Sequence, residues 1–251
     1  NMEYTLADKE GFPKPVFEVF DLFNFIENNS SISSHIDYDN FFIAGDSAGG
    51  HIASTVANIQ CNEDIKKVFD VNGGPKIKGL ILNSPVFGVF KFGNLPILKN
   101  KFEEIVFGDY KGTPIQQYCH NFDILSKNFP STIIFSANND ILKFHTKMFC
   151  KRAKKSGLNV QSYNFTAGKS LGHDFIIYNL ENNESKFAIN QISNFIIANQ
   201  NNQLSQGVNE YNINLKTMAK TKNSNKMKEG KLTKRQLLTE QKENSYCETT
   251  L

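Results

Sequence analysis

One serine of this chain stands between glycines in a spacing that supports nucleophilic chemistry. The stretch consists of Gly45, Asp46, Ser47, Ala48 and Gly49, with Gly50 directly after it. This G-x-S-x-G pattern is typical of a strained turn between a strand and a helix, where residues two before and two after the serine must lack side chains. The turn exposes the Ser47 hydroxyl and leaves the Ala48 N–H, at the helix start, free to bind an oxyanion. These residues therefore predict acyl transfer with Ser47 as the nucleophile.

The pattern alone is weak evidence, because a chain of this length contains it by chance about one time in ten. Its context strengthens it: the apolar run "FFIA" precedes it at 41–44, and a helix of small residues follows at 48–60. A glycine-rich turn that packs a helix on a strand, or that grips a phosphate, would look the same. The serine interpretation therefore needs an acid and a histidine farther along the chain.

An aspartate and a histidine follow in the order that such a turn requires. Asp140 stands just beyond the apolar run 131–137, and His173 stands in a glycine-flanked loop after the run 158–165. In serine hydrolases the carboxylate orients the imidazole, which takes the proton of the serine. We therefore predict that Asp140 holds His173 and that His173 activates Ser47.

Other acids and histidines compete for these roles. An aspartate after a strand is often a turn or helix-cap residue, and Asp140 could cap the next helix. Asp123 and Asp174 are rival acids, but the position of Asp140 relative to its strand fits the geometry better. His51 is the nearest rival histidine, and we expect it on a helix that points away from the site. The histidines expected to be structural are His35, His51, His120 and His145.

Strands that alternate with helices must position these residues. Apolar runs rich in β-branched and aromatic residues predict strands, and periods near 3.6 residues predict helices. The expected strands are 41–45, 77–85, 131–137 and 158–165, and the expected helices are 16–28, 48–60, 142–157 and 185–200. This alternation is typical of an α/β fold with a mostly parallel sheet and helices on both faces. The carboxyl ends of its strands share one edge, where we expect Ser47, Asp140 and His173 to meet.

Two segments depart from this alternation. Residues 86–128 carry many Phe and Leu side chains, and we interpret them either as a helical lid or as an irregular crossover with one helix. Residues 201–251 are polar and rich in lysine, with too few apolar residues to offset the entropy of ordering. We therefore predict one domain over 1–200 and a disordered basic tail over 201–251. Such a tail can touch an acidic membrane surface weakly, although a solvated extension without function is the preferred interpretation.

Composition excludes several function classes. A formal net charge of +3 is too small to predict a nucleic-acid-binding surface. The four cysteines are far apart, so neither a zinc site nor a disulfide framework is indicated, and we expect reduced, mostly buried thiols. Acyl transfer by Ser47, Asp140 and His173 requires no metal or organic cofactor, so we expect none. No apolar segment reaches the roughly 18 residues that span a bilayer. Residue 1 is Asn, which suggests that the chain lost a leader or begins inside a longer protein, so a cytoplasmic location is expected only without an upstream anchor or signal.

The chain resembles the hormone-sensitive-lipase-like family of α/β-hydrolases, which includes bacterial esterases and the arylacetamide deacetylases. Five stretches carry the resemblance: "YTLADKEGFP" at 4–13, "AGDSAGGHIA" at 44–53, "GLILNSPVF" at 79–87, "NNDIL" at 138–142 and "GHDF" at 172–175. They are similar to the family's Y-R-L-A-P-E-x-x-F-P segment, its nucleophile elbow, the strand beyond the elbow, and the stretches that supply its aspartate and histidine. The resemblance implies the α/β-hydrolase fold and a serine carboxylesterase or lipase-like enzyme that works through an acyl-enzyme.

The chain also departs from the family's pattern. Thr5 and Asp8 replace the Arg and Pro of the first segment, and Lys143 stands where a second aspartate often follows the catalytic one. The family's H-G-G-G loop supplies the second and third oxyanion N–H donors upstream of the first segment, and it is missing here together with the early strands. We therefore expect a partial sheet and an impaired site, since loss of one oxyanion donor costs about 10² to 10³ in turnover.

The expected substrate is a carboxylic ester with an apolar acyl or aryl part, because residues 86–128 would line the entrance with Phe and Leu. A catalytically impaired relative that only binds a ligand is one alternative. Plant gibberellin receptors are of this kind, but they lack the histidine that His173 supplies here. An amidase or deacetylase of the same fold is another alternative, because amide cleavage uses the same three residues.

Overall fold

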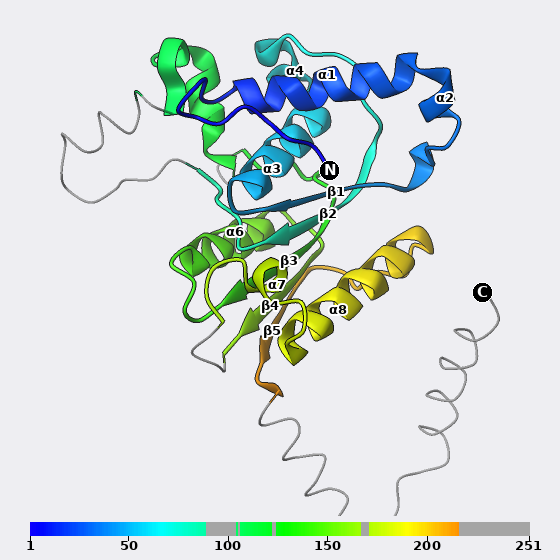
Figure 1. Cartoon of the computed structure of the whole chain (residues 1–251), viewed down its shortest axis with the longest axis vertical. Coiled ribbons are helices and arrows are strands. Elements are labelled where there is room, and N and C mark those ends of the chain that lie inside the picture. Colours follow the sequence, from blue (N-terminus) through cyan, green and yellow to red (C-terminus); the bar gives the residue numbers. More distant parts are fainter. Residues whose placement is uncertain (89–103, 105, 122–123, 167–170, 216–251) are drawn as a thin grey trace, which may run out of the picture. The chain divides into compact units, whose positions relative to one another are not determined.

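The chain divides into two compact units, Asn1–Ile213 and Asn214–Leu251, and a parallel β-sheet forms the framework of the first unit. The computed structural model describes residues 1–88, 104, 106–121, 124–166 and 171–215. The strands follow the order β1-β2-β3-β4-β5 across the sheet. Their bounds are β1 Phe41–Asp46, β2 Ile77–Asn83, β3 Ser131–Ala137, β4 Val160–Phe165 and β5 Val208–Ile213. All neighbouring strands pair in parallel, so their carboxyl ends lie along one edge (Figure 1).

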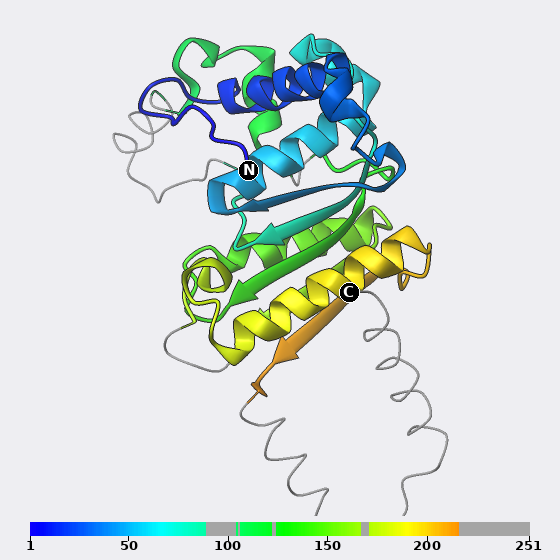
Figure 2. The same cartoon turned by 45° about the vertical axis from the view of Figure 1, so that its right-hand side comes forward.

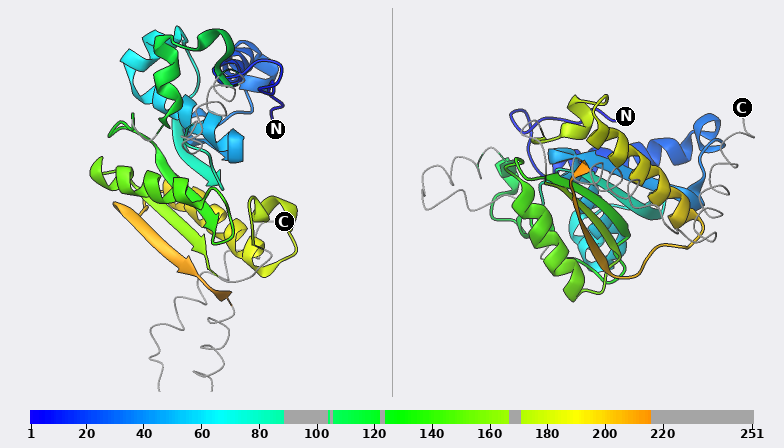
Figure 3. Two further views of the ribbon diagram at one scale, coloured as in Figure 1. Left: turned by 90° about the vertical axis from the view of Figure 1, so that its left-hand side faces the viewer. Right: turned by 90° about the horizontal axis from the view of Figure 1, so that it is seen from below.

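Helices cover both faces of this sheet. Their bounds are α1 Lys14–Asn28, α2 Ser30–Ser33, α3 Ser47–Cys61, α4 Glu63–Phe69, α6 Lys143–Lys155, α7 Phe175–Tyr178 and α8 Asn183–Gln200, with short 3₁₀ helices η1 Tyr38–Asn40, η2 Gly108–Tyr110 and η3 Pro114–Cys119. Helix α3 packs on β1 and β2, and α1 packs on α3. Helices α6 and α8 lie on opposite faces of the sheet (Figure 3), and Figure 2 shows α8 running along the direction of the strands. The predicted α/β architecture is confirmed.

Side chains of the strands alternate between two apolar layers. Leu82 of β2 and Ile134 of β3 are aligned in register and share a buried cluster with Phe149 of α6. Successive residues of a strand point to opposite faces, so Phe135 points to the other layer. There its ring stacks on Tyr163 of β4 with ring centroids 5.5 Å apart. Burial on both faces explains why the strands appear in the sequence as continuous apolar runs.

The predicted tail contains a strand. Strand β5 pairs in parallel with β4 over all 6 of its residues. The prediction that disorder begins at residue 201 is therefore wrong for residues 201–213. Residues 216–251 of the predicted tail lie outside the described residues.

Strand β5 lacks the apolar pattern of a core strand. Polar side-chain contacts hold much of it against the rest of the fold. The Lys154 ammonium donates to the Glu210 carboxylate at 2.6 Å, and the Asn164 amide donates to Oδ1 of Asn212 at 3.1 Å. Glu210 and its two successors are exposed, while Ile213 is buried. An edge strand of this kind gives little hydrophobic signal, since its backbone ladder and polar side chains supply the contacts.

The predicted lid, residues 86–128, is described only in part, and residues 89–103 lie outside the described part. Two of its phenylalanines belong to the core. Phe87 stacks on Phe149 of α6 with ring centroids 4.5 Å apart, and Phe107 is buried with its ring edge-on to Phe12. These two side chains are therefore not part of the apolar entrance that the sequence predicts.

Two further predictions concern membrane helices and thiols. Within the described ranges, no helix combines the length and the apolar character that crossing a bilayer requires. Cys61, Cys119 and Cys150 form no disulfide within the described residues, and the last two are buried. The prediction of mostly buried cysteines is confirmed for Cys119 and Cys150, whereas Cys61 is half-buried and Cys247 lies outside the described residues.

Candidate active site

The turn between β1 and α3 carries Ser47 in a strained conformation. Ser47 is the first residue of α3, and its φ of 47° lies in the left-handed region that residues other than glycine rarely adopt. Its carbonyl oxygen accepts the N–H of Val86 at 3.0 Å, which ties the turn to the segment beyond β2. Strain of this kind costs about 1 to 3 kcal/mol and persists only where surrounding contacts hold it. The turn therefore has the strained strand-to-helix geometry that the sequence predicts.

Two of the glycines around Ser47 are required by close packing. A Cβ atom at Gly45 would lie 2.5 Å from the carbonyl carbon of Gly49 and 2.7 Å from the amide nitrogen of Gly50. A Cβ atom at Gly50 would lie 2.7 Å from Cβ of Pro85, whereas one at Gly49 would meet nothing within 4 Å. The expectation that Gly49 must lack a side chain is therefore wrong. The backbone of Gly49 is what a side chain at Gly45 would meet. The second glycine that packing requires is Gly50.

Asp140 lies just beyond Ala137, the last residue of β3. The residue is 2% exposed, and its Oδ1 accepts the N–H of Leu142 at 2.8 Å and lies 3.0 Å from Nδ1 of His173. The first contact closes the turn that leads from β3 into α6. The second is the contact predicted for the acid beside the imidazole. Asp140 is not the cap of α6, because the N-cap residue is Leu142 and no side chain caps this helix.

His173 lies in the loop after β4 and links Asp140 to Ser47. Its Nε2 lies 2.8 Å from Oγ of Ser47, and its side chain is 32% exposed. When Nδ1–H is donated to Asp140, Nε2 carries the lone pair that accepts the serine O–H. The structure thus brings together the three predicted residues, each from the carboxyl end of a different strand.

A second carboxylate lies on the serine side of the imidazole. Oδ2 of Asp174 is 3.1 Å from Nε2 of His173, whereas Asp140 lies at the opposite ring nitrogen. Burial raises the pKa of Asp174 to about 6, His173 lowers it in part, and the charges of Asp46 and Asp140 raise it. Sequence reasoning missed this contact, because it depends on a left-handed backbone at Asp174, with φ 53°, that no local sequence pattern specifies. The other rival acid, Asp123, lies outside the described residues.

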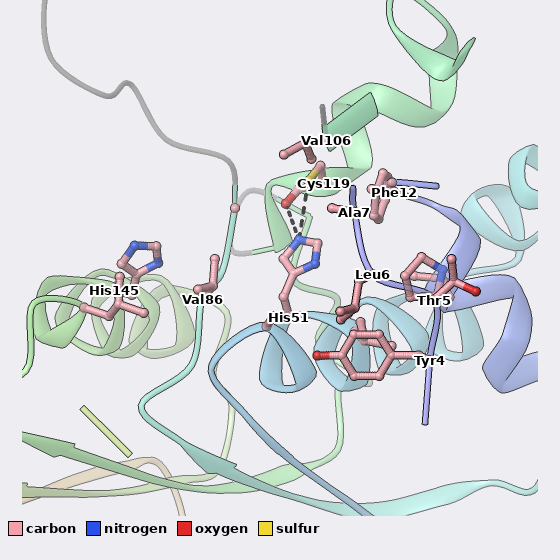
Figure 4. Close-up of a pocket in the computed structure, with 17 residues that line it drawn as sticks. Tyr4, Thr5, Leu6, Ala7, Phe12, His51, Val86, Val106, Cys119 and His145 are labelled. Carbon is pink, nitrogen blue, oxygen red and sulfur yellow. Dashed lines mark hydrogen bonds between the residues drawn. The ribbon is translucent and has the colours of Figure 1, made fainter. Parts of the chain in front are cut away.

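Two of the other histidines, the half-buried His51 and the buried His145, are uncharged near neutral pH. Burial lowers the pKa of His51 and of His145 to about 4. Nε2–H of His51 donates to the carbonyl of Cys119 at 2.8 Å, and Nδ1 of His145 accepts the N–H of Phe87 at 3.0 Å. His51 does not point away from the site as expected: both rings border the cavity beside Ser47 (Figure 4). The histidines that do not line this cavity are His35, His120 and His173.

An apolar cavity of about 390 Å³ lies beside the turn (Figure 4). Ala48, the residue after Ser47, forms part of its wall. Much of the lining is aliphatic or aromatic: Leu6, Phe12, Ile52, Val86, Val106 and Leu142. Burial raises the pKa of the Tyr4 phenol in the same wall, and the charge of Asp46 raises it as well. The cavity therefore offers an uncharged, largely apolar space beside Ala48, the residue after Ser47.

The N-terminus of α3 gives this space a positive end. The Ala48 N–H lies in the first turn of the helix, where backbone N–H groups lack a helical acceptor and the helix dipole is positive. Such a position stabilises negative charge that develops on a substrate oxygen. Among the described residues, no three His, Cys, Asp or Glu side chains are arranged to hold a metal ion.

Comparison with known protein families agrees with this geometry. A family model described as alpha/beta hydrolase fold matches residues 1–177. The chain belongs to the α/β-hydrolase family. The match includes Ser47, Asp140 and His173, whereas α8 and β5 of this α/β-hydrolase lie beyond it.

Individual relatives of the α/β-hydrolase are distant. A protein of Acanthamoeba polyphaga mimivirus, provisionally named alpha/beta hydrolase R526, is 24% identical over 193 residues, which cover 71% of this chain and 51% of the relative. The chain thus spans about half the length of that curated relative. Phosphonate-inhibited esterase B from Lactobacillus rhamnosis is similar in fold, with a TM-score of 0.71 and 20% identity over 80% of this chain and 65% of that one. A hyperthermophilic esterase from Pyrobaculum calidifontis has a TM-score of 0.59 and 18% identity, covering 81% and 66%.

Proposed function

We propose that this α/β-hydrolase is a serine carboxylesterase that cleaves esters through an acyl-enzyme on Ser47. The observation that carries the proposal is the 2.8 Å contact between Oγ of Ser47 and Nε2 of His173, with Asp140 at 3.0 Å from the other ring nitrogen. The similarity in fold to solved esterases supports the same class of reaction.

The reaction uses the imidazole as base and then as acid. His173 takes the hydroxyl proton as Oγ of Ser47 attacks the ester carbonyl carbon, and Asp140 stabilises the imidazolium that forms. The carbonyl electrons move to the oxygen, which the Ala48 N–H binds. Nε2–H then protonates the leaving alcohol as its C–O bond breaks, and the acyl group remains on Oγ. A water molecule, deprotonated by His173, hydrolyses this acyl-enzyme.

The oxyanion site of this chain rests on the Ala48 amide. The H-G-G-G loop that supplies further donors in the similar enzymes does not occur among the 251 residues. One oxyanion donor contributes about 10² to 10³ to turnover. We therefore expect slow hydrolysis by this chain, with acylation of Ser47 easier to detect than turnover.

The substrate is an ester whose acyl or aryl group is apolar. The cavity beside Ala48 holds about 390 Å³ and is lined mainly by aliphatic and aromatic side chains. Each methylene buried there contributes about 0.8 kcal/mol to binding. The close contact between Ser47 and His173 favours an enzyme over a relative that only binds a ligand, because ligand binding alone does not need it. Ester and amide substrates share this mechanism, so paired ester and amide probes must separate them.

Hydrolysis of p-nitrophenyl butyrate by the full chain tests the proposal. Ser47→Ala should abolish the activity, and Asp140→Asn should lower it by about 10⁴, because the imidazole loses its orienting acceptor. Ser31→Ala, at an exposed serine, is the matched control and should leave the rate unchanged. Hydrolysis that survives in Ser47→Ala, with the fold verified by circular dichroism, would overturn the proposal. The matched anilide measures the preference for amides.

A further inference from the structure

Asp174 contacts the reactive nitrogen of His173 but has no part in the reaction described above. Its Oδ2 lies 3.1 Å from Nε2, while Oγ of Ser47 lies 2.8 Å from the same atom. The side chain of Asp174 is 7% exposed, so little water reaches it. Two groups therefore compete for one nitrogen, which has a single lone pair or a single proton to offer.

Contacts from several elements hold Asp174 in this place. Its Oδ1 accepts the amide N–H of Asn83 at 3.2 Å, and its own N–H donates to Oγ of Ser84 at 3.2 Å. Its carbonyl accepts the N–H of Ile177 at 2.9 Å, at the start of α7. The backbone is left-handed, with φ 53° and ψ 30°, a conformation that aspartate and asparagine tolerate better than most residues. The carboxyl group is thus fixed beside the ring.

Counting protons shows what this contact requires. When Nδ1–H of His173 is donated to Asp140, the neutral ring presents a lone pair at Nε2. An ionised Asp174 would then place its lone pairs against that lone pair, which is repulsive. One added proton removes the repulsion, as a carboxyl O–H that donates to Nε2 or as an Nε2–H that donates to the carboxylate. Either arrangement occupies the atom that must accept the Ser47 proton.

We propose that Asp174 and His173 share one proton on the serine side of the ring, and that Ser47 becomes a strong nucleophile only when this proton is lost to solvent. The inference rests on the proposed function of Ser47 and His173. During acylation Nε2 takes the Ser47 proton, and the ionised Asp174 accepts a hydrogen bond from Nε2–H until the leaving alcohol removes that proton. The carboxylate therefore opposes the resting neutral ring and stabilises the charged one.

The surrounding groups strengthen this coupling. Asp46, at the end of β1, and Asp140, after β3, are the acids that act on Asp174, and β2 contributes the neutral Asn83 and, just beyond it, Ser84. Burial raises the pKa of Asp174 to about 6, close to the usual value of a histidine, about 6.5. The Asp174 carboxyl therefore still holds its proton in part near pH 6.

The pH dependence of Ser47 labelling by a fluorophosphonate tests this proposal. The second-order rate is measured from about pH 5 to pH 9 for the full chain and for Asp174→Asn, which keeps the shape and the left-handed backbone but removes the charge. The acidic limb should move down by about one pH unit, because the negative charge that holds the proton is gone. Relative to its own plateau, Asp174→Asn should therefore react about tenfold faster than the unaltered chain at the acidic end.

The matched control is Asp70→Asn. Asp70 is also a left-handed aspartate, with φ 49°, but it is exposed at the end of α4. Its substitution should leave the profile unchanged. A role of Asp174 in the fold alone would lower the plateau of Asp174→Asn without moving its midpoint, and an unmoved midpoint overturns the proposal.

Failure of the proposed function would look different, because no variant would then be labelled at Ser47 at any pH. In that event NMR titration of the His173 ring protons still tests the shared proton. The ring midpoint should fall by about one pH unit in Asp174→Asn and stay in place in Asp70→Asn. Equal midpoints in all three proteins would overturn the inference.

Discussion

The turn that carries Ser47 and the loop that carries His173 reach the same edge of the sheet, but different forces hold them. Backbone packing holds the turn, since a Cβ atom at Gly45 would lie 2.5 Å from the carbonyl carbon of Gly49. Side-chain contacts hold the loop. The residues that make them come from other parts of the fold: Asp140, Asn83 and Ser84.

This difference separates a fixed nucleophile from an adjustable base. A turn held by backbone atoms has one geometry, and a substitution that blocks it removes the geometry altogether. A loop held by side-chain hydrogen bonds can change one contact, or one proton, while the others remain. We therefore expect substitutions in the turn to act on folding and substitutions in the loop to act on pH dependence.

Gly45→Ala should break the turn and have the largest effect on stability. The added methyl group meets the backbone of Gly49 and Gly50 rather than the end of a flexible side chain, so the turn must shift. We expect the free energy of unfolding in urea to fall by about 3 kcal/mol. Labelling of Ser47 by a fluorophosphonate should be lost as well.

Gly49→Ala is the matched variant on the other side of the serine. Nothing lies within 4 Å of a Cβ atom at Gly49, and the residue belongs to the first turn of α3. Alanine favours a helix over glycine by about 0.5 to 1 kcal/mol, so the stability should be unchanged or slightly higher. Similar losses in Gly45→Ala and Gly49→Ala would show that backbone packing does not distinguish these positions.

The loop that carries His173 and Asp174 should have a smaller effect, seen in how the free energy of unfolding depends on pH. Burial raises the pKa of Asp174 from 3.8 to about 6, so the folded chain binds this proton more tightly than the unfolded chain. The stability that Asp174 contributes is then fully present below about pH 3.8 and is lost as the pH rises through about 6. The difference in unfolding free energy between the unaltered chain and Asp174→Asn should therefore shrink over this window. A difference that is constant from about pH 4 to pH 7 would contradict the raised pKa.

The same contrast explains how much the sequence could predict. The expected strand 41–45 and helix 48–60 correspond closely to β1 and α3, because buried parallel strands and small-residue helices leave clear patterns. Ser47, Asp140 and His173 could be identified because each must follow a strand, and strand ends can be located from apolar runs. Their contacts then follow from the parallel arrangement of the sheet.

Other features depend on atoms that no local pattern specifies. The G-x-S-x-G pattern names the glycines, but only the packing of the turn shows that Gly50 rather than Gly49 lacks room for a side chain. The contact of Asp174 with His173 needs a left-handed backbone and partners from β2, far away in the sequence. Strand β5 has exposed polar residues, so its place at the edge of the sheet could not be inferred from hydrophobicity.

Mass-spectrometric mapping of a fluorophosphonate adduct tests the central claim, that Ser47 is activated by His173, most directly. The account predicts a single adduct on Ser47 in the full chain. The labelling rate should fall at least about 100-fold in His173→Ala, because general-base catalysis contributes about 10² to 10⁴. It should stay the same in His35→Ala, where the exposed ring contacts the carbonyl of Ser31. An adduct on another residue, or a rate on Ser47 that does not depend on His173, would contradict the account.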